Sequence, residues 1–66
     1  MNGKYNKQYI ILGLDERDFW GESMYWSNKN GWTSSIVDAE KYPEPSEQGK
    51  CLVEEIMHGI YIQVGP

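Results

Sequence analysis

The sequence predicts an α+β fold: a small three-stranded, largely antiparallel sheet with one main helix and a short helical turn, in the order β-β-α-α-β. Short apolar runs rich in β-formers occur at residues 9–14, 23–27 and 60–64. A stretch with apolar residues four apart follows Ser46, as in a helix. The 66 residues form a single small domain, in which we expect residues 1–6 to be disordered.

The clearest element is the run "KQYIILGLD", which carries Tyr9, Ile10 and Ile11 between polar flanks. Its apolar residues point both ways, since Ile10 and Leu12 alternate with Tyr9 and Ile11. This pattern predicts a central strand, and the charged residues 15–22, "DERDFWGE", then form a loop.

The second strand is "SMYWS", and the "NKNG" that follows it has strong turn chemistry. Asn30 and Gly31 both tolerate a positive φ, so they can supply the turn. Trp26 and Trp32 stand on either side, and we assign them a structural role as core residues or a cross-strand pair.

Residues 33–42, "TSSIVDAEKY", predict a short helix or helical turn opened by Ser34 or Ser35, with Ser35 and Asp38 in capping-box spacing. The prolines of "YPEPSE" then end it.

The main helix is "EQGKCLVEEIMH", which Ser46 caps and in which Leu52 and Ile56 lie four apart. We expect Gly59 to end it. A hairpin in which residues 51–57 form a strand is the alternative, and the adjacent glutamates with Leu and Met favour the helix.

The last strand, "GIYIQV", places Ile60 and Ile62 on one face and Tyr61 on the other. We expect the helix to cover one face of the sheet, while the other carries some combination of Tyr9, Tyr25 and Tyr61. These tyrosines are secondary candidates for a binding surface or for pairing between two copies of the chain.

The composition excludes several classes of protein. One cysteine allows no disulfide within the chain and suits a reducing compartment, and no metal or other cofactor is expected. The longest apolar run is far short of the roughly 20 residues needed to span a membrane, so we expect a cytoplasmic protein. A net charge of −4 argues against direct nucleic-acid binding and favours a basic partner.

No catalytic residue is expected, and the chain is predicted not to be an enzyme. His58 is the only histidine, and on a helix it would lie roughly 10 Å from Cys51 along the axis, too far for direct contact.

The best candidate for a partner-binding surface is the acidic loop. Trp20 and Phe19 have no periodic reason to be buried there, and Trp is enriched in binding hot spots. The proposed contact residues are Asp15, Glu16, Asp18, Phe19, Trp20 and Glu22.

The segment "YWSNKNGW", followed by Ala39 and Tyr42, resembles a motif of small proteins from bacteriophages and bacterial mobile elements. In these proteins Tyr-Trp-Ser-Asn, two polar residues and Gly-Trp precede a short helix, an alanine and an aromatic residue. The resemblance covers residues 23–58 and departs at "YPEPSE" and in the acidic loop. It implies a mobile-element source and a small α+β fold, and it carries no catalytic residue.

We therefore expect a non-enzymatic phage or mobile-element protein that binds and inhibits a host protein in the bacterial cytoplasm. Anti-CRISPR and other anti-defence inhibitors of similar size and charge block basic surfaces of nucleic-acid-binding defence components by steric and electrostatic means. One alternative is a self-associating structural or regulatory protein that forms a homodimer. A second is a nucleotide or nucleic-acid binder that uses aromatic rings on the sheet.

Overall fold

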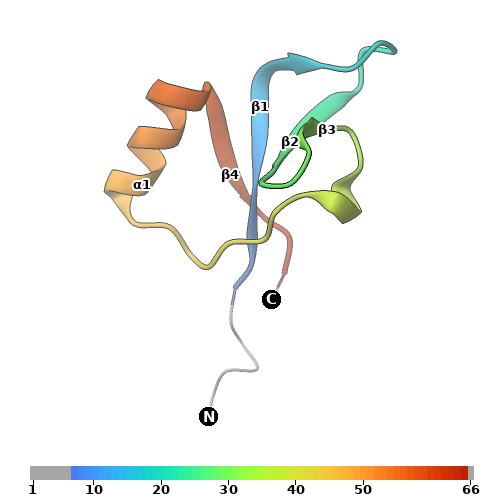
Figure 1. Cartoon of the computed structure of the whole chain (residues 1–66). Coiled ribbons are helices and arrows are strands. Elements are labelled where there is room, and N and C mark those ends of the chain that lie inside the picture. The colour runs from blue at the N-terminus through green and yellow to red at the C-terminus, as the bar shows by residue number, and fades with distance from the viewer. Residues whose placement is uncertain (1–6, 66) are drawn as a thin grey trace.

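A four-stranded antiparallel sheet runs through the molecule in the order β3-β2-β1-β4 (Figure 1). The computed structural model describes residues 7–65, so the disorder expected for residues 1–6 lies outside the described part of the chain. The elements are β1 (Tyr9–Arg17), β2 (Ser23–Ser27), β3 (Gly31–Thr33), the 3₁₀ helix η2 (Ile36–Asp38), α1 (Glu47–Leu52), the π-helical turn η3 (Val53–Met57) and β4 (Gly59–Gln63).

The α+β class and the antiparallel sheet are confirmed, but the prediction of three strands in the order β-β-α-α-β is wrong. The additional strand is β3, which begins directly after the turn because Gly31 adopts a φ of 75° and reverses the chain. Trp32 then lies opposite Trp26. A strand of three residues is too short to show an alternating pattern of its own.

Strand β1 is an interior strand, as expected, and it is longer than predicted because Asp15–Arg17 continue it instead of opening the loop. On one side it pairs with β4, where Ile10 lies opposite Ile62 and Leu12 opposite Ile60. On the other side it pairs with β2, and the register shifts between Leu12 and Arg17. Five residues of β1 thus span two residues of β2, an irregularity of the bulge type just before the β1–β2 turn.

The register defines two faces of the sheet, because directly opposed residues point to the same side. The aliphatic face carries Ile10, Leu12, Tyr25, Ile60 and Ile62. The aromatic face carries Tyr9, Ile11, Trp26, Trp32 and Tyr61.

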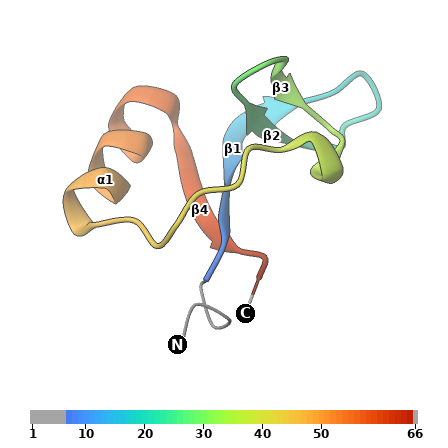
Figure 2. The same ribbon diagram turned by 60° about the horizontal axis from the view of Figure 1, so that its bottom comes forward.

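The helical segment, which consists of α1 and η3 (residues 47–57), packs on the aromatic face. A Cβ atom added to Gly59 would lie 2.9 Å from Ile11 Cγ2 and 3.5 Å from Val53 Cγ1, which places Val53 over this face. The prediction that the helix and the tyrosines occupy opposite faces is therefore wrong for two of the three: Tyr9 and Tyr61 share the face with the helix, and only Tyr25 lies on the other. In Figures 1 and 2, α1 and the β2–β3 hairpin lie on opposite sides of the β1–β4 pair.

The short helix or helical turn predicted within residues 33–42 is one turn of 3₁₀ helix, η2. Ser35 is its N-cap residue but makes no side-chain cap, so the expected capping box with Asp38 is absent. The Ser35 amide instead donates to Thr33 Oγ1 at 3.1 Å, and the Glu40 amide to the Trp26 carbonyl at 2.8 Å. These bonds attach the segment to the β2–β3 hairpin and compete with further helix.

Residues 47–57 are helical, which rejects the alternative hairpin. Ser46 caps α1 as predicted, since its Oγ accepts the Gly49 amide at 3.0 Å. The segment ends at His58, which takes a left-handed conformation with a φ of 53°, and Gly59 already belongs to β4. The predicted end at Gly59 is thus one residue late. The lack of a side chain at Gly59 instead allows the close approach of Ile11 across the β1–β4 pair.

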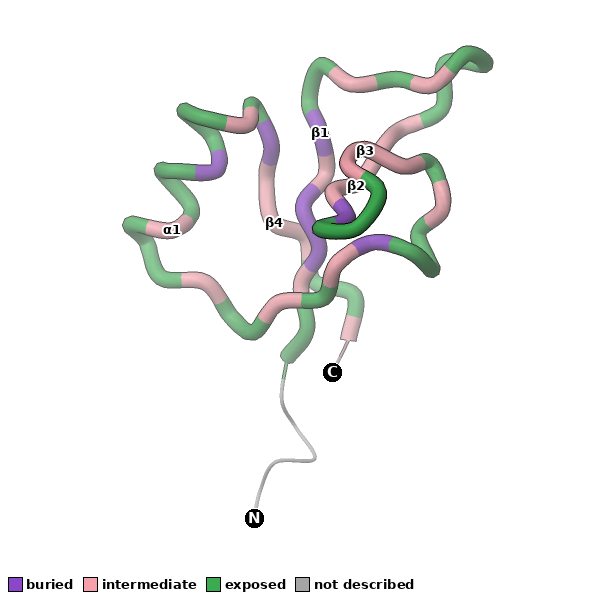
Figure 3. Tube along the Cα trace, in the orientation of Figure 1, coloured by how far each residue is buried: buried purple, intermediate pink, exposed green. Residues whose placement is uncertain are grey.

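The core is small and centred on β1 (Figure 3). Its buried apolar side chains are Ile10, Ile11, Ala39 and Val53. Other apolar side chains remain exposed on several elements, among them Leu14, Val37 and Ile56. The sheet thus holds few side chains away from water, and much of its apolar surface stays available for contact.

Candidate functional site

The β1–β2 connection is a tight turn organised by Asp18. One carboxylate oxygen, Asp18 Oδ1, accepts the amides of Trp20 at 2.9 Å and of Glu22 at 2.8 Å. Two backbone bonds of 3.0 Å close the turn, from the Gly21 amide to the Asp18 carbonyl and from the Asp18 amide to the Glu22 carbonyl. Gly21 has a φ of 81°, which a residue with a side chain adopts only under strain. The turn is therefore well ordered by its own hydrogen bonds.

This turn presents two aromatic rings to solvent. Phe19 is 91% exposed and Trp20 is 79% exposed. Their ring centroids lie 5.3 Å apart at an interplanar angle of 88°, an edge-to-face pair. The turn stands at the tip of the β1–β2 hairpin, away from α1 (Figure 1). We call Asp18, Phe19, Trp20 and Glu22 the turn surface.

The remaining acids proposed for this site lie along β1, before the turn. Asp15 is exposed, and its Oδ2 is 4.0 Å from His58 Nδ1. Glu16 is half-buried, and a Cβ on Gly13 would lie 3.0 Å from its Cβ and Cγ. The structure therefore brings four of the six proposed residues together and places Asp15 beside the end of η3.

The tryptophans of the "YWSNKNGW" segment form a cross-strand pair. Trp26 and Trp32 are register partners with ring centroids 5.5 Å apart at 78°. Trp26 Nε1 donates to Asn28 Oδ1 at 2.8 Å. In the turn itself the Asn30 amide donates to Ser27 Oγ at 3.1 Å. Only Gly31 in this turn uses a positive φ, so Asn30 serves the turn without the left-handed conformation.

Two of the candidate tyrosines belong to an aromatic cluster. Tyr61 packs edge-to-face with Tyr9, at 6.5 Å, and with Tyr42, at 5.9 Å. Tyr42 reaches this place because its amide and carbonyl pair with those of Tyr9, each bond 2.8 Å long. Burial raises the pKa of Tyr42, and the neighbouring Glu40 and Tyr61 add to the shift. Tyr42 stood out in the sequence only as the aromatic residue after the "YWSNKNGW" segment, and its place beside Tyr9 was not predicted, since an isolated bridge between distant residues leaves no local pattern.

The residues weighed for catalysis or metal binding do not come together. Cys51 lies on the exposed side of α1, and His58 has Asp15 as its acidic neighbour. Within residues 7–65, no group of three or more His, Cys, Asp or Glu side chains is placed to hold a metal ion. No helix in the same range is long and apolar enough to cross a membrane.

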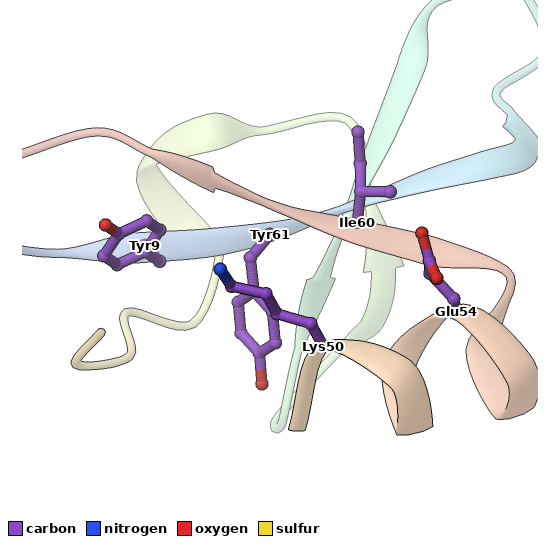
Figure 4. A pocket seen from close by; sticks show the side chains of 5 residues that line it. All are labelled: Tyr9, Lys50, Glu54, Ile60 and Tyr61. Atoms are coloured by element: carbon purple, nitrogen blue, oxygen red, sulfur yellow. The ribbon is translucent and has the colours of Figure 1, made fainter. Parts of the chain in front are cut away.

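A cavity of about 270 Å³ lies between α1 and β4 (Figure 4). Its lining residues are Tyr9, Lys50, Glu54, Ile60 and Tyr61. Lys50 Nζ donates to Glu47 Oε2 at 3.1 Å, and this pairing raises the pKa of Lys50. The cavity has aromatic rings on its sheet side and charged groups on its helix side.

No protein-family model, curated protein or solved structure matches the chain. The case for a function therefore depends on the geometry of these surfaces.

Proposed function

We propose that this chain is a non-enzymatic binding protein of a phage or mobile element, which inhibits a host protein by covering a basic surface on it. The turn surface makes the contact. The observation that supports this most directly is the exposure of Phe19 and Trp20, 91% and 79%, on a turn held by its own hydrogen bonds.

The energetic argument concerns the two rings. An aromatic side chain buries on the order of 150–250 Å² when it enters a pocket, and exposed rings at a loop tip forgo that gain. The hydrogen bonds to Asp18 fix the turn before any partner arrives. A pre-ordered turn loses less conformational entropy on binding than a flexible loop would. Phe19 and Trp20 therefore have the properties of interface anchors.

The charge of the chain indicates the kind of partner. Residues 15–22 contain four acids and one arginine, and the whole chain has a net charge of −4. Such a surface is attracted to a basic one, and a host defence component that holds nucleic acid presents a basic channel. An inhibitor bound there, of the anti-CRISPR or another anti-defence type, would act by steric and electrostatic blocking in the host cytoplasm.

Within the turn surface, Asp18 has a different role from its neighbours. Its Oδ1 already accepts two amides, so replacing Asp18 would disturb the turn as well as remove a charge. Glu22 offers a cleaner test of charge, because it takes part in the turn through its backbone.

The experiment compares the wild type with Phe19→Ala/Trp20→Ala and with Glu22→Lys in affinity capture from host lysate. The double variant should not recover a partner that recognises the turn surface, and Glu22→Lys should recover less of it than the wild type does. Its recovery by the wild type should fall as salt rises from about 50 mM to about 500 mM. Val37→Ala is the matched control, because Val37 is 83% exposed on η2 and lies outside the turn surface. Equal recovery of every partner by wild type and double variant removes the turn surface from the proposal.

Self-association is the second candidate, because apolar side chains are also exposed on the helical segment, with Leu52 at 49% and Ile56 at 72%. Light scattering separates the two functions. A dimer that Ile56→Asp dissociates and Trp20→Ala leaves intact would favour self-association, while a monomer favours the binding protein.

A further inference from the structure

Within residues 7–65, strand β4 is the outer strand of the sheet on the helical side, and β1 is its only neighbouring strand there. Its sequence, "GIYIQ", contains no charged residue and no proline. Proteins usually protect such an edge with charges, proline or a covering element, because its unpaired backbone groups can accept another strand.

Two backbone hydrogen bonds at the ends of the β1–β4 pair show which backbone groups of β4 point away from β1. The Val64 amide donates to the Gln8 carbonyl at 2.8 Å, and the His58 carbonyl accepts the Leu14 amide at 2.8 Å. Backbone groups alternate in direction along an antiparallel strand, so the even-numbered positions of β4 bond to β1. The amides and carbonyls of Tyr61 and Gln63 therefore face away from the sheet. No turn, loop or side-chain hydrogen bond found within residues 7–65 uses these four groups.

The cavity between α1 and β4 lies beside this edge. Tyr61 and Ile60 line it from β4, and Lys50 and Glu54 line it from the helical segment (Figure 4). In both ribbon views α1 lies on the side of β4 away from β1 (Figures 1 and 2). At about 270 Å³ the cavity is slightly below the usual range of small-molecule pockets, which begins near 300 Å³. Its size suits a short part of a peptide whose backbone continues along the edge.

Charge selects between two possible occupants of the edge. The helical segment, residues 47–57, carries three glutamates and one lysine, and the lysine is paired with Glu47. Two copies of the chain joined through β4 would bring these acids together around the interface. A basic segment would instead meet them with opposite charge.

We propose that the outer edge of β4 binds an extended, basic segment of a partner protein, which adds to the sheet as a fifth strand. The amides and carbonyls of Tyr61 and Gln63 hydrogen-bond to its backbone, as in other cases of β-augmentation. An apolar side chain of the segment enters the cavity, and its lysine or arginine side chains lie near Glu54. This site is separate from the turn surface, so either can fail without the other.

The probe is a blocked seven-residue peptide of alternating lysine and valine, compared with its glutamate-valine counterpart and with a form N-methylated at every second amide. Titration of the ¹⁵N-labelled protein should shift the amides of Tyr61 and Gln63 and slow their hydrogen exchange with the lysine peptide alone. Equal binding of the lysine and glutamate peptides, or shifts confined to the turn surface, would overturn the proposal.

Two variants sharpen the test. Gln63→Pro removes one outward amide and leaves the bonds to β1 in place, since proline is tolerated on an edge strand whose N–H faces solvent. Gln63→Pro should lower the affinity for the lysine peptide by roughly threefold to tenfold, the effect of one lost hydrogen bond. Gln63→Ala should not lower it. Glu54→Lys should lower the affinity for the lysine peptide and make that affinity less dependent on salt. Trp20→Ala should leave both the affinity and its salt dependence unchanged.

Light scattering of the wild type provides an independent outcome. A dimer that Gln63→Pro converts to a monomer would show that a second copy of the chain occupies the edge, and the proposal of a basic partner segment would then be wrong. If Gln63→Pro unfolds, the amide shifts of the wild type and the comparison of the three peptides still decide the question.

Discussion

Trp26 and Trp32 lie directly opposite each other on β2 and β3, with ring centroids 5.5 Å apart and planes at 78°. The pair joins the two strands of a hairpin whose second strand has three residues. The ring of Trp32 also closes over Gly13 of β1, where an added Cβ would lie 2.9 Å from Trp32 Cζ3. The pair therefore joins the short strand to the centre of the sheet.

The first prediction concerns this pair. In a double-mutant cycle on the free energy of unfolding, Trp26→Ala and Trp32→Ala should show a coupling of about 0.5–1.5 kcal/mol, the usual worth of an edge-to-face aromatic pair. Urea unfolding followed by circular dichroism measures it. Trp20→Ala serves as the control and should change stability by less than about 0.5 kcal/mol, because the ring is 79% exposed. Strict additivity of the two substitutions would contradict the packing described.

The second prediction concerns Gly59. An alanine there would place its Cβ 2.9 Å from both Ile11 Cγ2 and the Leu12 carbonyl oxygen, so Gly59→Ala should destabilise the protein by about 1–3 kcal/mol. Gly49→Ala is the matched control inside α1, where the nearest atom would be Ser46 Oγ at 3.3 Å and the better helix propensity of alanine offsets the crowding. Equal stability of the Gly59 variant and the wild type would mean that Ile11 and Leu12 of β1 do not approach Gly59 this closely.

The third prediction compares two helix caps. Ser46→Ala removes the hydrogen bond from the Gly49 amide to Ser46 Oγ and should cost about 0.5–2 kcal/mol. Ser35→Ala should cost less than about 0.5 kcal/mol, because Ser35 is the N-cap residue of η2 without a side-chain cap. Thermal and urea unfolding of both variants check the difference. A larger loss for the Ser35 variant would reverse the assignment of the caps.

The fourth prediction concerns pH. Burial raises the pKa of Tyr42 above the ordinary 10.0, so the folded protein holds the phenol proton more tightly than the unfolded chain does. The stability that this provides is complete below pH 10 and is lost as the pH rises through the folded-state pKa. Between about pH 8 and pH 11, the free energy of unfolding in urea should fall less for Tyr42→Phe than for the wild type. At pH 8 the comparison isolates the hydrogen bond of 3.2 Å from the Tyr42 hydroxyl to Asn28 Oδ1.

The sequence predicted the elements whose signals are local. The β-branched run around Ile10 indicated an interior strand, and Ser46 marked the start of the main helix. Strand β3 was missed because three residues carry no periodicity. The side of the sheet that the helix covers was missed because it depends on Val53 and Gly59 meeting Ile11, which is distant in the sequence. At the candidate site, Phe19 and Trp20 stood out because no periodic pattern predicted that they would be buried, and both are exposed. Asp18 was predicted as a contact residue, and its hydrogen bonds to two amides became visible only with the turn itself.

The two parts of the helical segment differ in how closely they pack on the rest of the protein, because η3 contains a buried residue and α1 does not. Val53 is its one buried residue, while none of the residues of α1 is buried. Local opening of a protein has a free energy set by the contacts it breaks, and an element held by one side chain opens long before the sheet unfolds. The amides of α1 should thus exchange faster than those in the middle of β1. Because α1 forms one wall of the cavity beside β4, the same local opening would set how fast an incoming strand reaches the edge of the sheet.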